Sequence, residues 1–181
     1  LQRPAQRLGE VKPNAAHYAI ADLEKEYSVT VITQNVDNLH ERAGSTKVLH
    51  LHGEATKVRP EEGEYDRTYS EKEVIDIGYG EVHLGDNAPN GSQLRPHIVF
   101  FGEAVPNIEK AIDIVAAADI MLIVGTSLNV YPAAGLYRYA PNAAPIYLID
   151  PEDVAVNDPR ITHIREVATK GMETFRKLLE R

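Results

Sequence analysis

The sequence has 181 residues, 43% of them hydrophobic, which suits a single domain with a sizeable core. Its formal net charge is −8 with acidic and basic residues interspersed, so we expect no nucleic-acid partner. The absence of cysteine excludes disulfides, thiolate zinc sites and cysteine nucleophiles. Because no apolar run reaches roughly 18 residues and no basic-then-apolar leader is visible, we expect a cytoplasmic protein without a membrane partner.

Apolar strands alternate with helical patterns along the chain. Residues 14–27 place apolar side chains at helical spacing, with Asn14 as a suitable N-cap. The other expected elements are strands at 29–33, 47–51, 97–101, 119–125 and 144–150, short helices at 38–44 and 132–140, and longer helices at 107–118 and about 166–179. This alternation predicts an α/β fold, with a doubly wound, mainly parallel sheet of Rossmann-like type.

Residues 54–95 differ in composition from the rest of the chain, because they are rich in glycine, proline and charged residues. They predict a small inserted module between two parts of a Rossmann-like domain, residues 1–53 and 96–181. The candidates for the small core of this module are Tyr65, Tyr69, Val74, Ile75, Ile77 and Tyr79.

Three strands end in polar or small residues: "TQNVDNLH", "GTSLNVYPA" and "LIDPEDV". In a parallel sheet these ends lie at one edge and can converge on one ligand. Gln34, Asn35 and Asp37 are tolerated there because a bound molecule supplies their hydrogen-bond partners. "Gly-Thr-Ser" at 125–127 either binds a phosphate or ribose at a helix start or forms only a turn and N-cap, and local sequence leaves both open.

Two other segments also allow two interpretations. In "VLHLHGE", His50 and His52 point to the same face of a strand. They are either metal ligands, with Glu54 as the obvious third, or one of them is a general base; their spacing does not decide. Residues 97–101, "HIVFF", are either a core strand or an exposed edge that pairs with an extended peptide.

Six stretches, taken in order and with their separations, resemble the sirtuin family. They are "KPNAAHYAIADLE", "VITQNVDNLHERAGS", "VLHLHGE", "LRPHIVFFGE", "ADIMLIVGTSLNVYPAA" and "APIYLID", running from about Lys12 to the C-terminus. The resemblance implies an NAD-dependent protein-lysine deacylase, which transfers the acyl group from lysine to ADP-ribose and releases nicotinamide.

The resemblance also implies roles for individual residues. The histidine of the His-Gly step is the family's catalytic base, which selects His52 over His50. The implied NAD-binding residues are Gln34, Asn35 and Asp37 at the nicotinamide end, Gly125, Thr126 and Ser127 at the adenosine ribose and phosphates, and Asp150 and Ala168 at the adenine side. The implied residues for an acyl-lysine protein or peptide are Val99, Phe101, Gly102 and Glu103.

The chain departs from the family in three ways. The Gly-Ala-Gly-x-Ser turn with which sirtuins begin is missing, so we expect this chain to be a piece of a longer one, the alternative being an inactive protein. The four zinc cysteines are missing, so no zinc is expected. Asp150 stands where the family usually has asparagine, and a carboxylate accepts hydrogen bonds but cannot donate them. The competing functions are a non-catalytic NAD- or ADP-ribose-binding module and a mono-ADP-ribosyltransferase.

Overall fold

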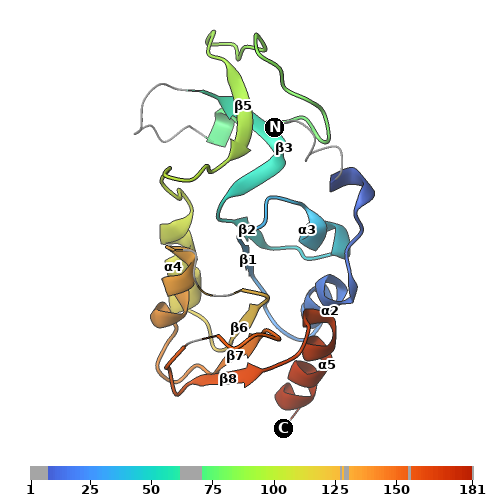
Figure 1. Cartoon of the computed structure of the whole chain (residues 1–181), viewed down its shortest axis with the longest axis vertical. Coiled ribbons are helices and arrows are strands. Elements are labelled where there is room, and N and C mark those ends of the chain that lie inside the picture. Colours follow the sequence, from blue (N-terminus) through green and yellow to red (C-terminus); the bar gives the residue numbers. More distant parts are fainter. Residues whose placement is uncertain (1–7, 62–70, 127, 129–130, 155, 181) are drawn as a thin grey trace.

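The computed structural model describes residues 8–61, 71–126, 128, 131–154 and 156–180. Its elements are α2 (Ala15–Leu23), β1 (Val31–Thr33), α3 (Leu39–Ala43), β2 (Val48–His50), β3 (Gly53–Pro60), the 3₁₀ helix η1 (Glu71–Glu73), β4 (Ile75–Asp76), β5 (Leu94–Ile98), α4 (Ile108–Ala116), β6 (Met121–Val124), the 3₁₀ helix η2 (Ala133–Tyr139), β7 (Ile146–Ile149), β8 (Ile161–Ile164) and α5 (Ala168–Leu179). Figure 1 shows an elongated molecule with β3 and β5 at one end and β6, β7 and β8 toward the other.

The parallel strands form two separate sheets. β1 pairs with β2, and β7 lies between β6 and β8. The predicted α/β class with parallel pairing is therefore confirmed. Among the described residues, β1 and β6 each have one strand neighbour, so each leaves one edge without a strand on it.

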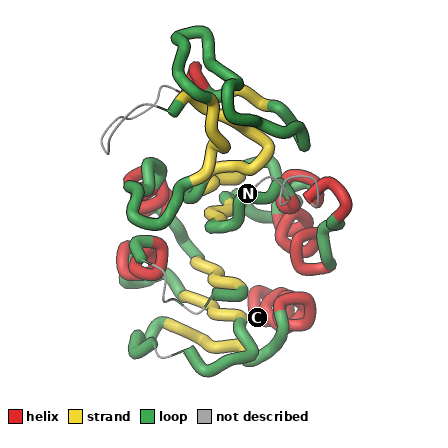
Figure 2. The backbone as a smooth tube through the Cα atoms, turned by 45° about the horizontal axis from the view of Figure 1, so that its top comes forward, coloured by secondary structure: helices red, strands yellow, loops and turns green. Residues whose placement is uncertain are grey.

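Strand β7 is buried on both faces, as its apolar run predicts. Ile146 and Leu148 belong to one apolar cluster, with α4 and η2, whereas Ile149 belongs to a second cluster, with α2 and α5. Successive strand residues point to opposite faces, so one strand contributes to both cores. Figure 2 shows the helices on either side of the strands, the arrangement of a doubly wound sheet. Each of these fully buried side chains stabilises the fold by about 1.5–3 kcal/mol.

Side-chain packing joins the two parallel sheets. Leu51, which directly follows β2, is 1% exposed and lies in the same cluster as Ile123 of β6. Ile32 of β1 and Leu49 of β2 pack against that cluster. The polar residues that follow β1 and β2 are therefore held on the same core as the β6–β7 sheet.

The third sheet is antiparallel, with β3 between β4 and β5. Its first pair, Gly53 opposite Ile98, starts directly after His52. Two of the predicted core residues of this region, Ile75 and Tyr79, are 40% and 39% exposed, so that part of the prediction is wrong. Tyr65 and Tyr69 lie outside the described residues, and the proposed boundaries at 53/54 and 95/96 stay a prediction.

Helix ends follow their local sequence signals. The side chain of Asn14 accepts hydrogen bonds from the backbone N–H groups of Ala16 and His17, which confirms it as the N-cap of α2. Helix α3 ends at Gly44, whose φ of 110° lies in the left-handed region that glycine tolerates.

Two predicted features differ from the structure. The strand expected at 97–101 is β5, which ends at Ile98 because residues 100–103 form a turn. The short helix expected at 132–140 is the 3₁₀ helix η2, whose first turn is closed by a bond from Gly135 N–H to the Pro132 carbonyl. Strand β8 was not predicted; it lies at a sheet edge and mixes polar with apolar residues.

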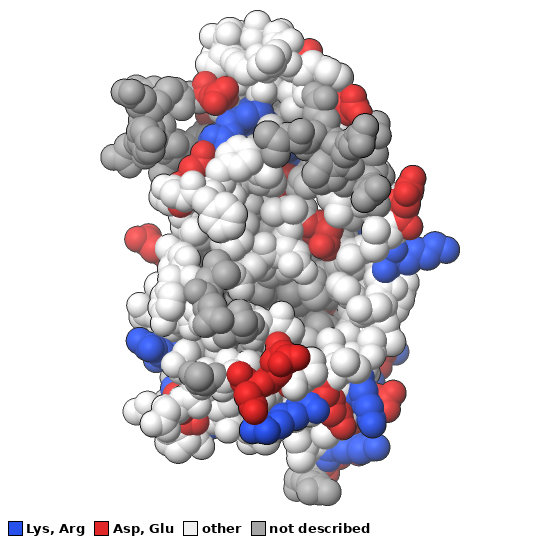
Figure 3. All heavy atoms as spheres, viewed as in Figure 1, with Lys and Arg blue, Asp and Glu red and all other residues white. Residues whose placement is uncertain are grey.

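Within the described residues, no helix is both long and apolar enough to span a membrane. Figure 3 shows acidic and basic side chains next to one another along the lower part of one face, in keeping with their interspersion in the sequence.

Candidate active site

The polar run after β1 lies beside the segment that follows β2. The N–H of Leu51 donates to the Thr33 carbonyl (2.9 Å), and the N–H of Ala55 donates to the Val36 carbonyl (2.8 Å). The N–H of Asn35 donates to the Thr33 hydroxyl oxygen at 3.0 Å. Hydrogen bonds within the protein therefore fix the backbone of this polar run without a ligand.

Two histidines contact successive carbonyl oxygens of this run. Nδ1 of His52 lies 3.1 Å from the Gln34 oxygen, and Nδ1 of His50 lies 3.2 Å from the Asn35 oxygen. A carbonyl oxygen only accepts, so in each ring Nδ1 carries the hydrogen. In neutral His52 the lone pair is therefore on Nε2, which no group among the described residues engages. A half-buried imidazole in this form can accept a proton from a bound hydroxyl.

His50 differs because its second nitrogen is already occupied. It is 6% exposed, and its Nε2 lies 2.7 Å from Oε1 of Glu41 on α3. Of the two histidines that spacing left equivalent, only His52 presents a ring nitrogen to a ligand. Glu54 completes a group of three potential metal ligands within 4.8 Å of one another, but its carboxylate bonds Lys57 at 2.6 Å.

Of the three polar side chains predicted at the nicotinamide end, one is hydrogen-bonded within the protein and two are not. Oδ1 of Asp37 accepts from the N–H of Leu39 at 3.0 Å, so this carboxylate also starts α3. The side-chain amides of half-buried Gln34 and exposed Asn35 make no hydrogen bond within the described residues. Their amides are therefore open to a ligand, while their backbones are fixed.

The predicted substrate segment begins one hydrogen bond away from the candidate base. The N–H of Val99 donates to the carbonyl of His52 at 2.9 Å. Beyond it the chain turns, with Phe101 fully exposed and Gly102 at a φ of 90°. Phe101 thus projects from a turn rather than from a strand.

Glu103 braces this turn through its carboxylate. Its oxygens accept hydrogen bonds from the Arg95 guanidinium at 2.7 and 3.2 Å and from the N–H of Phe100 at 2.9 Å. Burial alone would raise the pKa of Glu103, but these donors outweigh it and hold the pKa below its usual value. Arg95 also stacks over the Phe100 ring at 4.6 Å. The N–H of Glu103 also donates to the Phe100 carbonyl at 3.0 Å, so within the described residues only its backbone carbonyl makes no hydrogen bond.

At the other sheet, strands β6 and β7 are parallel, so their carboxyl ends lie at one edge. Gly125 follows β6 with a φ of 62°, and a Cβ placed there would meet no atom of the described residues within 4 Å. The Thr126 hydroxyl oxygen accepts from the N–H of Leu128 at 3.2 Å, a local turn bond. Ser127 lies outside the described residues. The space in front of Gly125 leaves room for a group to approach the backbone closely.

The remaining two predicted residues lie after β7 and at the start of α5. Asp150 is 9% exposed and caps a turn, its Oδ1 accepting from the N–H of Glu152 at 2.9 Å. Ala168 is the first residue of α5, where free N–H groups favour an anion or an acceptor. A Cβ on Gly171 would come within 2.3 Å of Ile149, which shows how closely this helix packs on β7.

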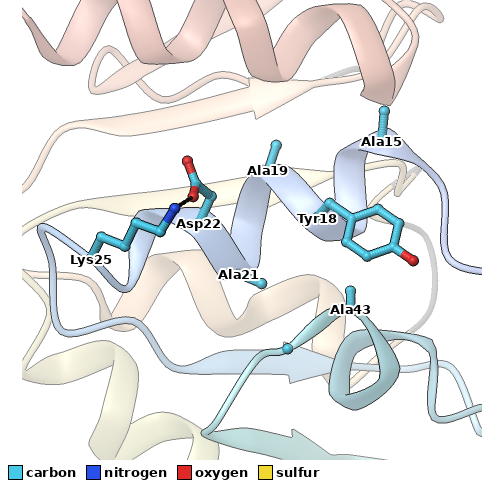
Figure 4. Close-up of a pocket in the computed structure, with 8 residues that line it drawn as sticks. Ala15, Tyr18, Ala19, Ala21, Asp22, Lys25 and Ala43 are labelled. Atoms are coloured by element: carbon cyan, nitrogen blue, oxygen red, sulfur yellow. Dashed lines mark ion pairs between the residues drawn. The ribbon is translucent and has the colours of Figure 1, made fainter.

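Two hollows of the surface lie elsewhere. A space of about 640 Å³ is lined by α2 and α3, mainly by alanines with the Asp22–Lys25 ion pair at its side (Figure 4). A smaller one of about 270 Å³ lies between α4 and η2. None of the sequence-predicted site residues lines either hollow.

Three residues that support the site were not identified from the sequence. Glu41 holds His50, Arg95 holds Glu103, and Asn107 donates from its side chain to the His50 carbonyl at 2.9 Å. Arg95 and Glu103 are eight residues apart, a spacing that carries no signal without the turn between them.

Comparison with known proteins identifies the family. The Sir2 family profile matches residues 2–132. The chain belongs to the Sir2 family. It is 55% identical over 174 residues to an NAD-dependent protein deacylase of Bacteroides thetaiotaomicron, covering 96% of this chain and 74% of that protein.

Two solved Sir2 structures resemble this chain in fold. One is a Sir2 homologue in complex with NAD, with a TM-score of 0.78 at 30% identity, covering 97% of this chain and 68% of that one. The other is a Sir2 protein with a p53 peptide and NAD⁺, with a TM-score of 0.69 at 29% identity, covering 96% of this chain and 72% of that one. The Sir2 fold is therefore shared over nearly the whole chain.

The side chains present fit NAD. Free amides and an unengaged imidazole nitrogen follow β1 and β2, which suits a nicotinamide ribose. Open space at Gly125 and the start of α5 suit phosphates, and a carboxylate at Asp150 suits ribose hydroxyls.

Proposed function

We propose that this Sir2 family protein is an NAD-dependent protein-lysine deacylase, which transfers the acyl group of a modified lysine to ADP-ribose and releases nicotinamide. Family membership and 55% identity to a protein named for this activity support the proposal. The observation that carries it is the state of His52: one ring nitrogen donates to the Gln34 carbonyl and the other is open.

The proposed catalytic role of His52 follows from that hydrogen bond. When bound, NAD supplies the ribose carbon that takes the acyl oxygen, the hydroxyl that then receives the acyl group, and the nicotinamide that leaves. His52 accepts the proton of that hydroxyl at Nε2 while Nδ1–H stays on the Gln34 carbonyl. The ring thus cannot turn away as it becomes charged, and its positive charge remains next to a carbonyl dipole.

The groups that follow β1 orient the nicotinamide end. In this proposal the amides of Gln34 and Asn35 and the carboxylate of Asp37 supply both donors and acceptors to the base and its ribose. Gly125, Thr126, Ser127, Asp150 and Ala168 are proposed to hold the adenosine half.

The peptide-binding part of the proposal rests on the turn after β5. The bond between Val99 N–H and the His52 carbonyl sets the substrate turn against the base. Phe101, fully exposed, is available to cover the acyl group and keep water away from it. An acyl-lysine protein or peptide is the proposed partner, and a related Sir2 protein has been solved with a p53 peptide.

An acetyl-lysine peptide, NAD and the protein form the test, with O-acetyl-ADP-ribose measured by mass spectrometry. His52→Ala is expected to reduce kcat by roughly 10²- to 10⁴-fold, the usual contribution of a general base. His83→Ala is the matched control, because His83 is 59% exposed and pairs only with surface carboxylates.

The alternatives give different results in the same assay. NAD binding by calorimetry without any product would leave a nucleotide-binding module. Nicotinamide release with ADP-ribose attached to protein, and no acyl transfer, would indicate an ADP-ribosyltransferase. Equal turnover by His52→Ala and wild type would refute the role given to His52.

A further inference from the structure

Buried His50 and exposed Glu41 form a pair next to the nicotinamide end of the candidate site. His50 is 6% exposed and bonds the Asn35 carbonyl through Nδ1 and the Glu41 carboxylate through Nε2. We propose that His50 and Glu41 are positioning residues, which set the main chain of Asn35 so that its side-chain amide faces the nicotinamide end of NAD. This inference rests on the function proposed above.

The hydrogen-bond chemistry makes the two residues one unit. Both partners of the His50 ring, a carbonyl oxygen and a carboxylate, are acceptors, so each ring nitrogen needs a hydrogen to make its bond. At 2.7 Å the contact between Nε2 and Glu41 is a short, charge-assisted bond. Without Glu41, one nitrogen of a buried ring loses its partner, and the ring can turn away from Asn35.

Two other polar groups near the ring have different partners. Asn107 holds the backbone carbonyl of His50 at 2.9 Å, so the strand end itself stays in place when the ring moves. Glu54, the other carboxylate near the ring, is taken by Lys57 at 2.6 Å.

The backbone of Asn35 is bonded within the protein, whereas its side chain is open to solvent. Its N–H is held by the Thr33 hydroxyl, but its side chain is exposed and its carbonyl has the His50 ring as its partner. Gln34, one residue earlier, has the same arrangement with His52. His50 at the end of β2 and His52, two residues beyond it, thus hold two successive carbonyls, and Glu41 leaves only one of these two rings open for proton transfer.

Two substitutions at Glu41 separate positioning from stability. Glu41→Ala removes the carboxylate, which is 37% exposed, so the protein is expected to fold. Glu41→Gln is the conservative rescue: its amide can donate to Nε2 of neutral His50, whose Nδ1–H stays on Asn35. Glu24→Ala is the control, since Glu24 makes a comparable brace, to the N–H and hydroxyl of Thr46, away from the site.

Three measurements are made on each variant: the KM for NAD and for peptide, NAD binding by calorimetry, and hydrogen exchange of the Asn35 amide. Glu41→Ala is expected to raise the KM and Kd for NAD on the order of ten-fold, with the peptide KM changed less than about two-fold. Exchange at Asn35 is expected to rise by a similar factor. Glu41→Gln is expected to restore all three values to within about three-fold.

Three results would overturn the inference. They are unchanged Asn35 exchange in Glu41→Ala, an equal rise in both KM values, or a loss of NAD affinity that Glu24→Ala reproduces. Absence of turnover in the wild type would refute the deacylase proposal alone, because exchange at Asn35 needs neither NAD nor peptide.

Discussion

The two halves of the candidate site are held by different means. After β1 and β2, two histidine rings and two backbone hydrogen bonds tie the polar run to the neighbouring segment. After β6 and β7, Thr126 and Asp150 each accept a hydrogen bond from the N–H two residues further on, and no described residue fills the space at Gly125. We call the first the braced half and the second the open half.

The difference suits what each half is proposed to do. Proton transfer from a ribose hydroxyl needs reacting groups held within a fraction of an ångström, so the half that contains His52 gains from cross-bracing. Phosphates and an adenosine are bound by backbone groups and a helix start, which need free approach. Substitutions in each half test whether the bracing of one and the open space of the other are needed for stability and NAD binding.

The largest expected effect is a loss of stability in Gly53→Ala, a substitution in the braced half. Gly53 has a φ of 77°, and a Cβ there would lie 2.0 Å from the carbonyl oxygen of His97 on β5. Backbone strain and overpacking together are expected to reduce the free energy of unfolding by about 3 kcal/mol or more, measured by urea denaturation. A loss below about 1 kcal/mol would show that β3 and β5 can move apart freely.

The same substitution in the open half is expected to act on binding instead. Gly125→Ala places its Cβ in open space at a φ of 62°, so its cost in stability is about 1–2 kcal/mol from backbone conformation alone. The methyl group then stands where NAD is proposed to approach, and the KM for NAD is expected to rise several-fold. An unchanged KM for NAD would remove Gly125 from the proposed binding residues.

Asp150→Asn is expected to strengthen NAD binding in the open half. The asparagine can still accept from the N–H of Glu152, and its amide can in addition donate to a ribose or adenine acceptor. One added hydrogen bond is expected to lower the KM for NAD by roughly 2- to 10-fold, measured by steady-state kinetics. A raised KM would mean that the carboxylate itself makes the better contact.

The smallest effect is expected at the end of the strands away from the site. Asp158 binds the Arg160 guanidinium at 2.7 Å, and Arg160 in turn donates to the Ala140 carbonyl at 2.8 Å. Hydrogen bonds from the Arg160 side chain and backbone lower the pKa of Asp158 from 3.8 to about 2.

A carboxylate with a lowered pKa stabilises the fold only while it is ionised. The Tm difference between wild type and Asp158→Asn is therefore expected to be complete above pH 3.8 and to vanish as the pH falls through about 2. The KM for NAD should stay unchanged. A Tm difference that is independent of pH would contradict the ion pair as its source.

Much of the parallel core was predictable because its residues obey simple periodicity. The apolar runs from Met121 to Val124 and from Ile146 to Ile149 specify buried strands without tertiary information. The polar strand ends at 34–37 and at 125–127 stood out because they interrupt such strands.

The braces of the site were not predictable because they depend on contacts distant in sequence. His50 and His52 are equivalent by spacing, and in the structure the contact of Glu41 from α3 with His50 distinguishes them. The end of β5 at Ile98 depends on the turn that Glu103 closes with Phe100, although the residues 99–101 have strong strand propensity. In both places, the choice between the histidines and the end of β5, side-chain hydrogen bonds determine the structure and the local sequence pattern does not.

The hydrogen bond between the backbone of Val99 and the carbonyl of His52 also bears on how the protein can change over evolution or by engineering. It joins base and substrate turn through main-chain atoms, so its formation does not depend on the side chain at 101. Phe101 is fully exposed and packs on nothing that the base needs. If Phe101 covers the acyl group as proposed, replacing it is expected to alter which acyl group is accepted while the geometry at His52 is kept, so this turn is a starting point for redesigning acyl selectivity.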